Sequence, residues 1–216
     1  MGTVGGRMSW PKPQFGATDW SIEATETRAS GFFQLDRLTL THRGYQTEQV
    51  GPMHRELFIR DPAVVAILFD PAQDAVVMVE QFRIGAAMSP LEDSPWLLEW
   101  VAGICDPGEE PRATCIREIR EETGLAVQGS PELLFTYYPS PGGSTELIYL
   151  YICEVDSTQT PQFHGQAGEH EDLKVHVIAR QDAIDALEAG QVNNAATIIG
   201  LQWLKDQHTN AEIRGL

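Results

Sequence analysis

Three glutamates at fixed spacing are the residues of this sequence best suited to chemistry. Glu118, Glu121 and Glu122 lie in the segment Pro111–Thr123. This segment is predicted to be a helix, since proline suits a first helical turn and the following Gly124 suits the position just past its end. At about 100° per residue the three carboxylates share one stripe beside the apolar face. Carboxylates so placed repel one another, and a divalent cation relieves the repulsion by taking their oxygens as ligands.

Two other interpretations of this stripe need no metal. Arg117 is placed to pair with Glu121 one turn later, which also offsets the repulsion. An acidic stripe is, in addition, a common feature of a solvated helix face. The residues on either side of the helix must therefore decide between these interpretations.

The surrounding residues form a longer pattern with fixed spacing. The pattern is G-x5-E-x7-R-E-U-x-E-E-x-G-U, with U apolar, and its fixed positions are occupied by Gly103, Glu109, Arg117, Glu118, Ile119, Glu121, Glu122, Gly124 and Leu125. By this pattern the chain resembles the Nudix hydrolases. The resemblance implies hydrolysis of nucleoside diphosphates linked to another group. It also implies an α/β (α+β) fold in which a mixed β-sheet lies between helices.

The resemblance assigns roles within this pattern. Glu118 and Glu122 are expected to be the principal metal ligands, Glu121 an auxiliary ligand and the backbone carbonyl of Ala102 a further one. The expected cofactor is Mg²⁺, with Mn²⁺ as a substitute and two or three ions per active site. Four residues are expected to hold the loop and helix in place: Gly103, Glu109, Arg117 and Gly124.

The acidic segment near residue 170 supplies the remaining catalytic assignments. The resemblance makes Glu169 the general base that deprotonates the attacking water, and Glu171 another metal ligand. His170 is an alternative base, and the other histidines receive no role. Composition alone would predict only a solvated acidic loop here.

Further segments resemble bacterial ADP-ribose pyrophosphatases within the family. They are Gly31-Phe32-Phe33, Arg55-Glu56-Leu57-Phe58, Glu80-Gln81-Phe82-Arg83, Trp96-Leu97-Leu98-Glu99, Ser140-Pro141-Gly142-Gly143, Glu169-His170-Glu171-Asp172 and Asn194-Ala195-Ala196. A marker of that subfamily is a proline sixteen residues after the pattern, and Pro141 is sixteen residues after Leu125. The resemblance implies cleavage of ADP-ribose to AMP and ribose 5-phosphate. Phe32 would stack on adenine, and the substrate would be lined by Arg55, Glu56, Arg60, Arg83, Ile104 and Glu146.

These substrate assignments have simpler alternatives. Phe32 and Phe33 could be core residues of a β-rich segment, the arginines could be surface residues, and Ser140-Pro141-Gly142-Gly143 could be only a turn. Arginine forks are, however, natural clamps for phosphate oxygens. The sequence departs from the subfamily at Cys105-Asp106 and at Tyr137-Tyr138, which could change the pocket for the terminal ribose or the preferred metal.

Two other functions remain open at this point. One is hydrolysis of a different nucleoside diphosphate sugar, because the Nudix pattern names the reaction and not the substrate. The other is a non-catalytic module that binds ADP-ribose. Such a module is expected to lose carboxylates of the pattern, and this chain keeps all of them.

The alternation of apolar and polar residues, together with turn residues, predicts the elements around the site. We expect a tail over 1–19, an N-terminal antiparallel β domain over 20–60 broken at Gly31, Gly44 and Gly51-Pro52, and a hydrolase domain over 61–216. In the hydrolase domain, strands are expected at Ala63–Phe69, Ala75–Phe82, Leu133–Tyr138, Leu147–Val155 and Leu173–Ile178, and helices near Gln181–Ala189 and Asn194–Gln207. The resemblance implies a homodimer in which the N-terminal domains are exchanged, and a sheet as small as 20–60 buries little of its own surface.

Composition limits the remaining possibilities. The 216 residues carry a formal net charge of −16, which disfavours nucleic acid as a partner, RNA decapping included. Residues 1–60 are near neutral at +1, so the acidity is concentrated after them. No apolar run is long enough for a membrane span. The three cysteines are odd in number and lack zinc spacing, so we expect a cytoplasmic protein without a disulfide framework.

Overall fold

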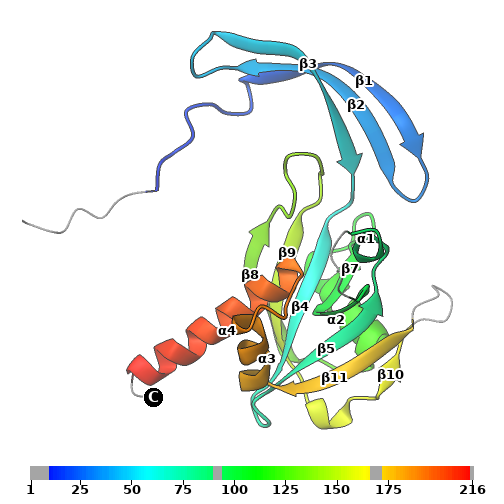
Figure 1. Ribbon diagram of the computed structural model, residues 1–216, viewed down its shortest axis with the longest axis vertical. Coiled ribbons are helices and arrows are strands. Elements are labelled where there is room, and N and C mark those ends of the chain that lie inside the picture. Colours follow the sequence, from blue (N-terminus) through cyan, green and yellow to red (C-terminus); the bar gives the residue numbers. More distant parts are fainter. Residues whose placement is uncertain (1–9, 90–93, 166–171, 215–216) are drawn as a thin grey trace, which may run out of the picture. The chain divides into compact units, whose positions relative to one another are not determined.

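The computed structural model describes residues 10–89, 94–165 and 172–214 (Figure 1). Internal contacts divide the chain into two compact units. The smaller unit runs to Arg60 and includes Gly142–Ser144, and the larger contains Asp61–Pro141 and the chain from Thr145 onward. Each unit is described below by itself.

The smaller unit is a small antiparallel sheet, as the sequence predicts, and it has three strands. Its strands are β1 (Trp20–Ser30), β2 (Gln34–Arg43) and β3 (Gln49–Ile59), in the order β1-β2-β3. All residues of β1 are exposed, and the buried residues of the sheet lie on the central strand β2. The sheet on its own therefore buries very little apolar surface.

The predicted break at Gly51-Pro52 is wrong, because β3 continues through both residues. The pairing of β3 with β2 shifts here: His42 is opposite Val50, whereas Leu40 is opposite Met53. This shift leaves one additional residue on β3, as in a β-bulge, and Gly51 has a φ of 113°. A bulge accommodates a glycine at positive φ and a proline that lacks an N–H without ending the strand.

The larger unit is built on an eight-stranded mixed sheet. Its path has the order β10-β11-β5-β4-β9-β8, while β6 pairs with β5 and β7 pairs with β4. Strands β4 and β9 are parallel and the other pairs are antiparallel. The strands are β4 (Ala63–Asp70), β5 (Ala75–Phe82), β6 (Trp96–Glu99), β7 (Val101–Ile104), β8 (Gln128–Tyr137), β9 (Ile148–Glu154), β10 (Phe163–His164) and β11 (Leu173–Ala179).

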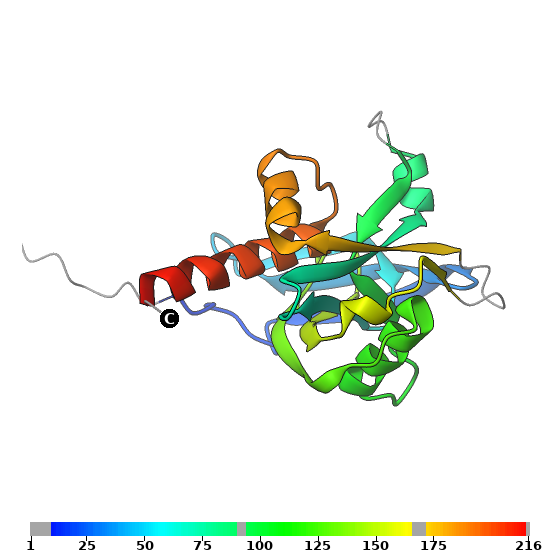
Figure 2. The same ribbon diagram turned by 90° about the horizontal axis from the view of Figure 1, so that it is seen from below.

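Helices cover both faces of this sheet. They are α1 (Ile84–Ala87), α2 (Pro111–Thr123), α3 (Arg180–Glu188) and α4 (Ala195–Arg214), and a short 3₁₀ helix spans Ser157–Gln159. Cys115 and Ile119 of α2 pack on one face of the sheet, and Leu201 and Leu204 of α4 pack on the other. Figure 2 shows α2 on one side of the sheet and the pair α3 and α4 on the other. The nearly continuous apolar run of β4 is explained by this burial on both faces.

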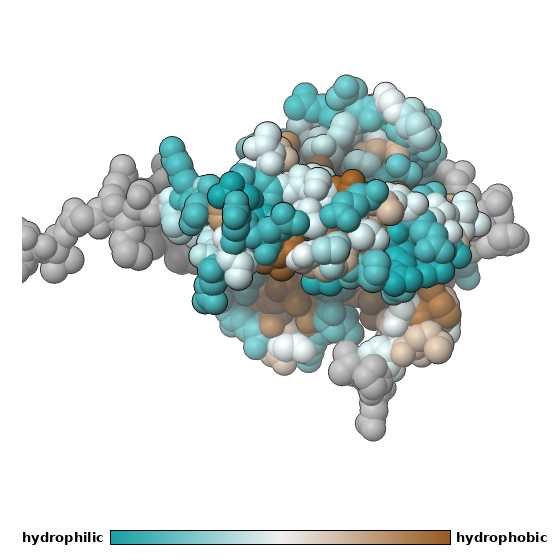
Figure 3. Space-filling view, turned by 90° about the horizontal axis from the view of Figure 1, so that it is seen from above, coloured by the Kyte–Doolittle hydropathy of each residue, from teal (hydrophilic) through white to brown (hydrophobic). Residues whose placement is uncertain are grey.

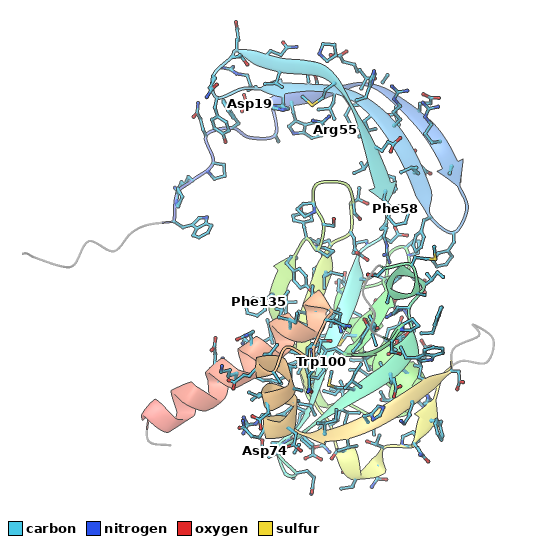
Figure 4. The ribbon with its side chains drawn as sticks, in the orientation of Figure 1. Asp19, Arg55, Phe58, Asp74, Trp100 and Phe135 are labelled. Atoms are coloured by element: carbon cyan, nitrogen blue, oxygen red, sulfur yellow. The ribbon has the colours of Figure 1, made fainter. Side chains whose placement is uncertain are left out.

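Most predicted elements of this unit are confirmed, with shifted ends. Helix α2 has the predicted bounds. Helix α1 and strand β10 are not predicted, because each is too short to show a hydrophobic period. The apolar segment Trp96–Val101 is two strands, β6 and the start of β7, separated by Trp100. Trp100 is only 1% exposed and lies in the interior of the unit (Figure 4).

The surface agrees with the charged composition. The face drawn in Figure 3 is mostly hydrophilic, and its hydrophobic residues occur in small separate groups. Among the described residues, no helix is long and apolar enough to cross a membrane. Cys105, Cys115 and Cys153 are all buried free thiols, as expected from the lack of a disulfide pattern.

Candidate active site

Helix α2 presents its carboxylates at the boundary between core and solvent. The helix starts at Pro111 and ends at Thr123, and the Gly124 that follows has a φ of 70° and donates its N–H to the Arg120 carbonyl oxygen over 3.0 Å. Glu122 is 2% exposed, so its carboxylate faces the interior beside the apolar side of the helix. This burial excludes the interpretation of the whole stripe as a solvated face.

Arg117 connects three of the four glutamates of the sequence pattern. Its Nη1 donates to Glu118 Oε1 over 2.7 Å and to Glu121 Oε2 over 2.8 Å. Its Nη2 donates to Glu109 Oε2 over 3.0 Å. The predicted pair between Arg117 and Glu121 is therefore confirmed, and it belongs to a larger network. One guanidinium offsets the repulsion among these carboxylates and fixes their positions.

Glu109 joins the loop before α2 to the helix. The Arg117 guanidinium holds the pKa of its carboxyl at about 2, and Thr114 Oγ1 supports this by donating to Glu109 Oε2 over 2.8 Å. The Asp106 N–H also donates to Glu109 Oε2. Since Thr114 is fully buried, the carboxylate is anchored from the core side as well as from the helix surface.

Gly103 allows the Glu118 carboxylate to lie directly on strand β7. A β-carbon at position 103 would overlap the carboxyl group of Glu118. Gly103 pairs with Val64 of β4, and Ala102 pairs with Val65, so the sheet fixes this segment of backbone. The backbone at Ala102–Gly103 and the side chain of Glu118 are thus brought together, as the sequence pattern requires.

The donor set at this position suits a hard divalent cation. Carboxylate and carbonyl oxygens are the ligands that Mg²⁺ and Mn²⁺ prefer, and the missing side chain at Gly103 leaves Glu118 a place against β7. Within the described part of the chain, no three His, Cys, Asp or Glu side chains are already gathered around one point. Glu169 and Glu171, the predicted base and further ligand, lie outside the described residues, as does His170.

The predicted substrate residues of the larger unit have defined surroundings. Arg83 donates through Nε to Glu99 Oε2 over 2.7 Å, and the Ile104 carbonyl accepts from Arg117 Nη2 over 3.3 Å. Burial raises the pKa of the Tyr137 phenol, and the nearby Glu146 carboxylate raises it further. Glu146 thus lies close to one of the two tyrosines that depart from the subfamily pattern.

The predicted substrate residues of the smaller unit include an aromatic and cationic cluster. Phe32 and Phe33 have ring centroids 4.6 Å apart, and those of Phe33 and Phe58 are 4.9 Å apart. The Arg60 guanidinium lies 4.6 Å from the Phe33 ring centroid. Phe32 is 86% exposed, so the alternative that it is a core residue of this unit does not hold.

Two further predicted residues of this unit lie on β3. Arg55 and Glu56 are exposed, and Arg55 Nη1 donates to the backbone carbonyl of His54 over 2.8 Å. Figure 4 shows Arg55 and Phe58 on the same strand.

The segment that contains α2 lies within a match to a known protein family. Residues 59–198 match the NUDIX domain, which is more than half of the chain. The chain belongs to the Nudix family. The predicted fold class, a mixed sheet between helices with a small N-terminal antiparallel sheet, is thereby confirmed together with the observed topology.

Curated relatives cover nearly the whole chain. The ADP-ribose pyrophosphatase of Haemophilus influenzae (strain ATCC 51907 / DSM 11121 / KW20 / Rd) is 42% identical over 192 residues, 88% of either chain. The ADP-ribose pyrophosphatase of Escherichia coli (strain K12) is 41% identical over 194 residues, which is 90% of this chain and 91% of that one. The GDP-mannose pyrophosphatase of Escherichia coli (strain SMS-3-5 / SECEC) is 32% identical over 154 residues, 71% of this chain and 78% of that one.

Two residues that hold predicted site residues in place receive no role in the sequence analysis. Thr114 anchors Glu109, and Glu99 holds Arg83. Glu109 stands just before the predicted helix and Thr114 in its first turns, so their closeness in the sequence could have suggested the first contact. Glu99 is sixteen residues from Arg83, and only the pairing of β5 with β6 brings the two together.

Proposed function

We propose that the protein hydrolyses ADP-ribose to AMP and ribose 5-phosphate. The observation that carries this proposal is identity of 41–42% over about nine tenths of the chain with proteins named ADP-ribose pyrophosphatase. The carboxylates of the Nudix pattern are all kept, and Arg117 connects three of them, Glu109, Glu118 and Glu121. These features support catalysis over the alternative of a non-catalytic binding module.

We propose Mg²⁺ as the cofactor, with Mn²⁺ as a substitute and two or three ions per site. Glu118, Glu122, Glu171 and the Ala102 carbonyl would hold the ions, with Glu121 as an auxiliary ligand. When bound, the ions neutralise the diphosphate and acidify a water molecule. Gly103, Glu109, Arg117 and Gly124 keep these ligands in position. This assignment fits the buried position of Glu122 and the contact of Glu118 with β7.

Glu169 is proposed as the general base. It takes a proton from the attacking water, whose oxygen forms a bond to phosphorus while the bond to the bridging oxygen breaks. The products are AMP and ribose 5-phosphate, with the leaving phosphate as an anion. Hydrolysis is therefore balanced by one water molecule and needs no other reactant.

Substrate binding is proposed for residues of both units. Phe32 would stack on adenine, and Arg55, Glu56 and Arg60 would bind the nucleotide from the smaller unit. Arg83, Ile104 and Glu146 would bind from the larger unit. The exposed Phe32 ring packs against Phe33, and the Arg60 guanidinium lies over the Phe33 ring. This combination is suited to a base that is linked to phosphates, since an aromatic ring stacks on the base and guanidinium groups bind phosphate oxygens.

We further propose a cytoplasmic homodimer with exchanged N-terminal sheets. The exposure of β1 and most of β3 supports a partner for this sheet, because a small sheet needs a packed hydrophobic face to be stable and this one buries residues only on β2. The charge of −16 argues against nucleic acid, and no membrane partner is proposed. The odd number of cysteines is consistent with a reducing compartment.

A second candidate is hydrolysis of another nucleoside diphosphate sugar. It is favoured by the 32% identity with a protein named GDP-mannose pyrophosphatase. The purified protein should be incubated with ADP-ribose, GDP-mannose and other nucleoside diphosphate sugars, with and without Mg²⁺, and the products separated by chromatography. Metal-dependent release of AMP from ADP-ribose at the highest kcat/KM supports the proposal. A higher kcat/KM for another nucleoside diphosphate sugar would make that sugar the preferred substrate. Tight binding of ADP-ribose without hydrolysis would support the non-catalytic binding module.

A further inference from the structure

His164 connects strand β10 to the last turn of helix α2. Its Nδ1 lies 2.8 Å from the backbone carbonyl oxygen of Glu121, although the two residues are 43 positions apart in the sequence. A carbonyl oxygen can only accept a hydrogen bond, so Nδ1 carries the hydrogen and donates it. The side chain of a histidine to which the sequence assigns no role thus contacts the helix that carries the candidate metal ligands.

The bond from His164 is made to a carbonyl group in the last turn of the helix. The last four carbonyl groups of an α-helix have no partner within the helix. In α2, the Gly124 N–H satisfies the Arg120 carbonyl, and His164 satisfies the Glu121 carbonyl. The accepting oxygen belongs to the peptide that joins Glu121 to Glu122, so the bond fixes the backbone between two candidate ligands.

Gly124 leaves room for the imidazole ring. A β-carbon at position 124 would lie 3.0 Å from His164 Nε2 and 3.3 Å from Cδ2, both closer than ordinary van der Waals contact. The φ of 70° at this position also favours glycine. The glycine of the Nudix pattern therefore ends the helix and also lets His164 approach the Glu121 carbonyl.

The sheet fixes the position of His164 from the other side. His164 pairs with Leu173 of β11, and Leu173 is 2% exposed. Strand β11 pairs in turn with β5 along most of its length. The backbone of His164 is consequently held by the sheet, and its imidazole connects this strand to the end of α2.

We propose that His164 is a positioning residue for the divalent cation. It keeps the last turn of α2, and with it Glu121 and Glu122, in the orientation that binds the metal. This inference rests on the proposed metal-binding role of α2. It does not depend on which nucleoside diphosphate sugar is hydrolysed.

Asparagine and glutamine substitutions separate this role from simple packing. The amide nitrogen of asparagine reaches about the position of Nδ1, whereas that of glutamine extends toward the position of Nε2. The variants to compare are His164→Asn, His164→Gln and His164→Ala. His176→Ala is the matched control, because His176 is also half-buried in the same sheet but bonds Glu80.

The first measurement is Mn²⁺ binding to the protein without substrate, by electron paramagnetic resonance titration. We expect His164→Ala and His164→Gln to raise the Kd for Mn²⁺ about tenfold, as is common for residues that orient metal ligands. His164→Asn should stay within about twofold of wild type, since it keeps the donor, and His176→Ala should not change the Kd. In activity assays at half-saturating Mg²⁺, the rate should fall in His164→Ala and His164→Gln and stay near that of wild type in His164→Asn and His176→Ala. The KM for ADP-ribose should change little.

Several outcomes would overturn the inference. Wild-type affinity for Mn²⁺ in His164→Ala or His164→Gln would show that the bond to Glu121 does not matter. Equal weakening in His164→Asn and His164→Gln would point to ring packing and not to the donor. Wild-type protein that binds no Mn²⁺ would overturn it too. If His164→Ala does not fold, the Asn and Gln variants still give the comparison. Wild-type protein that binds Mn²⁺ but hydrolyses no nucleoside diphosphate sugar would refute only the proposed function.

Discussion

Gly103 and Glu118 are in such close contact that a β-carbon on the glycine would occupy the place of the carboxyl group. Gly103 is held in strand β7 by its pairing with β4, so it cannot move aside easily. Glu118 is in turn held by Arg117 at 2.7 Å. The requirement for glycine here is therefore steric and local to the candidate metal site.

Replacing Gly103 with alanine should displace the Glu118 carboxylate. We expect kcat with saturating Mg²⁺ to fall at least tenfold and the Kd for Mn²⁺ to rise, because a ligand moved by about 1 Å no longer fits the ion. Gly85→Ala is the control, since a β-carbon at position 85 meets no neighbouring atom. Steady-state kinetics and Mn²⁺ titration of both variants check this. Unchanged metal affinity in Gly103→Ala would argue against Glu118 as a ligand.

Replacing Glu122 with glutamine should abolish turnover while the fold is kept. The side chain is buried, and glutamine has the same shape but lacks the charge that binds a cation. Circular dichroism and thermal unfolding should resemble wild type, and the rate at saturating Mg²⁺ should fall by at least a hundredfold. Glu132→Gln on β8, where the side chain is exposed, is the matched control. A rate near that of wild type would exclude Glu122 as a principal ligand.

The parts of this site that depend on local sequence could be predicted. The bounds of α2 follow from a proline, a glycine and the helical period, and the pair of Arg117 with Glu121 follows from a spacing of one turn. The same reasoning identified the strands β4 and β5, whose apolar runs are long. It failed at Gly51-Pro52, where pairing with β2 carries the strand through two residues that usually end one.

The parts that depend on tertiary contacts could not be predicted. Glu99 and Arg83 meet only because β6 pairs with β5, and His164 reaches Glu121 only because β10 lies at the edge of the sheet beside α2. Trp100 separates two strands in a segment whose sequence has no turn residue between them. In each case the partner is fixed by the packing of distant segments, which a single sequence does not specify.

Replacing Phe32 with alanine should weaken substrate binding and leave folding stability unchanged. Because the ring is 86% exposed, its removal creates no cavity in the protein. Loss of a stacked base costs about 1–3 kcal/mol, so the KM for ADP-ribose should rise roughly fivefold or more. Tyr45→Ala, which removes another exposed aromatic ring of the same unit, is the control. A normal KM in Phe32→Ala would exclude stacking on the adenine.

Acid should destabilise the fold through Glu109. Its pKa is about 2 in the folded protein against a usual value of 4.5, so the stabilisation is complete above about pH 4.5 and is lost as the pH falls toward 2. Thermal melts from pH 7 to pH 2.5 should show a decline below pH 4.5. In Glu109→Gln the Tm should be lower at pH 7, and the part of the decline that Glu109 causes should be absent. An identical acid profile in the two proteins would show that Glu109 does not cause it.

Replacing Gly200 with alanine should destabilise the larger unit by overpacking. A β-carbon at this position of α4 would overlap Trp100 Nε1 and lie 3.0 Å from Ile67 Cδ1, and both side chains are buried. Inserting a methyl group into such a core costs about 1–3 kcal/mol of unfolding free energy, measurable by urea denaturation. Trp100→Leu removes the indole and leaves a cavity, so the double variant Trp100→Leu/Gly200→Ala should lose less than the two single losses together. Strictly additive losses would show that Trp100 and Gly200 do not interact.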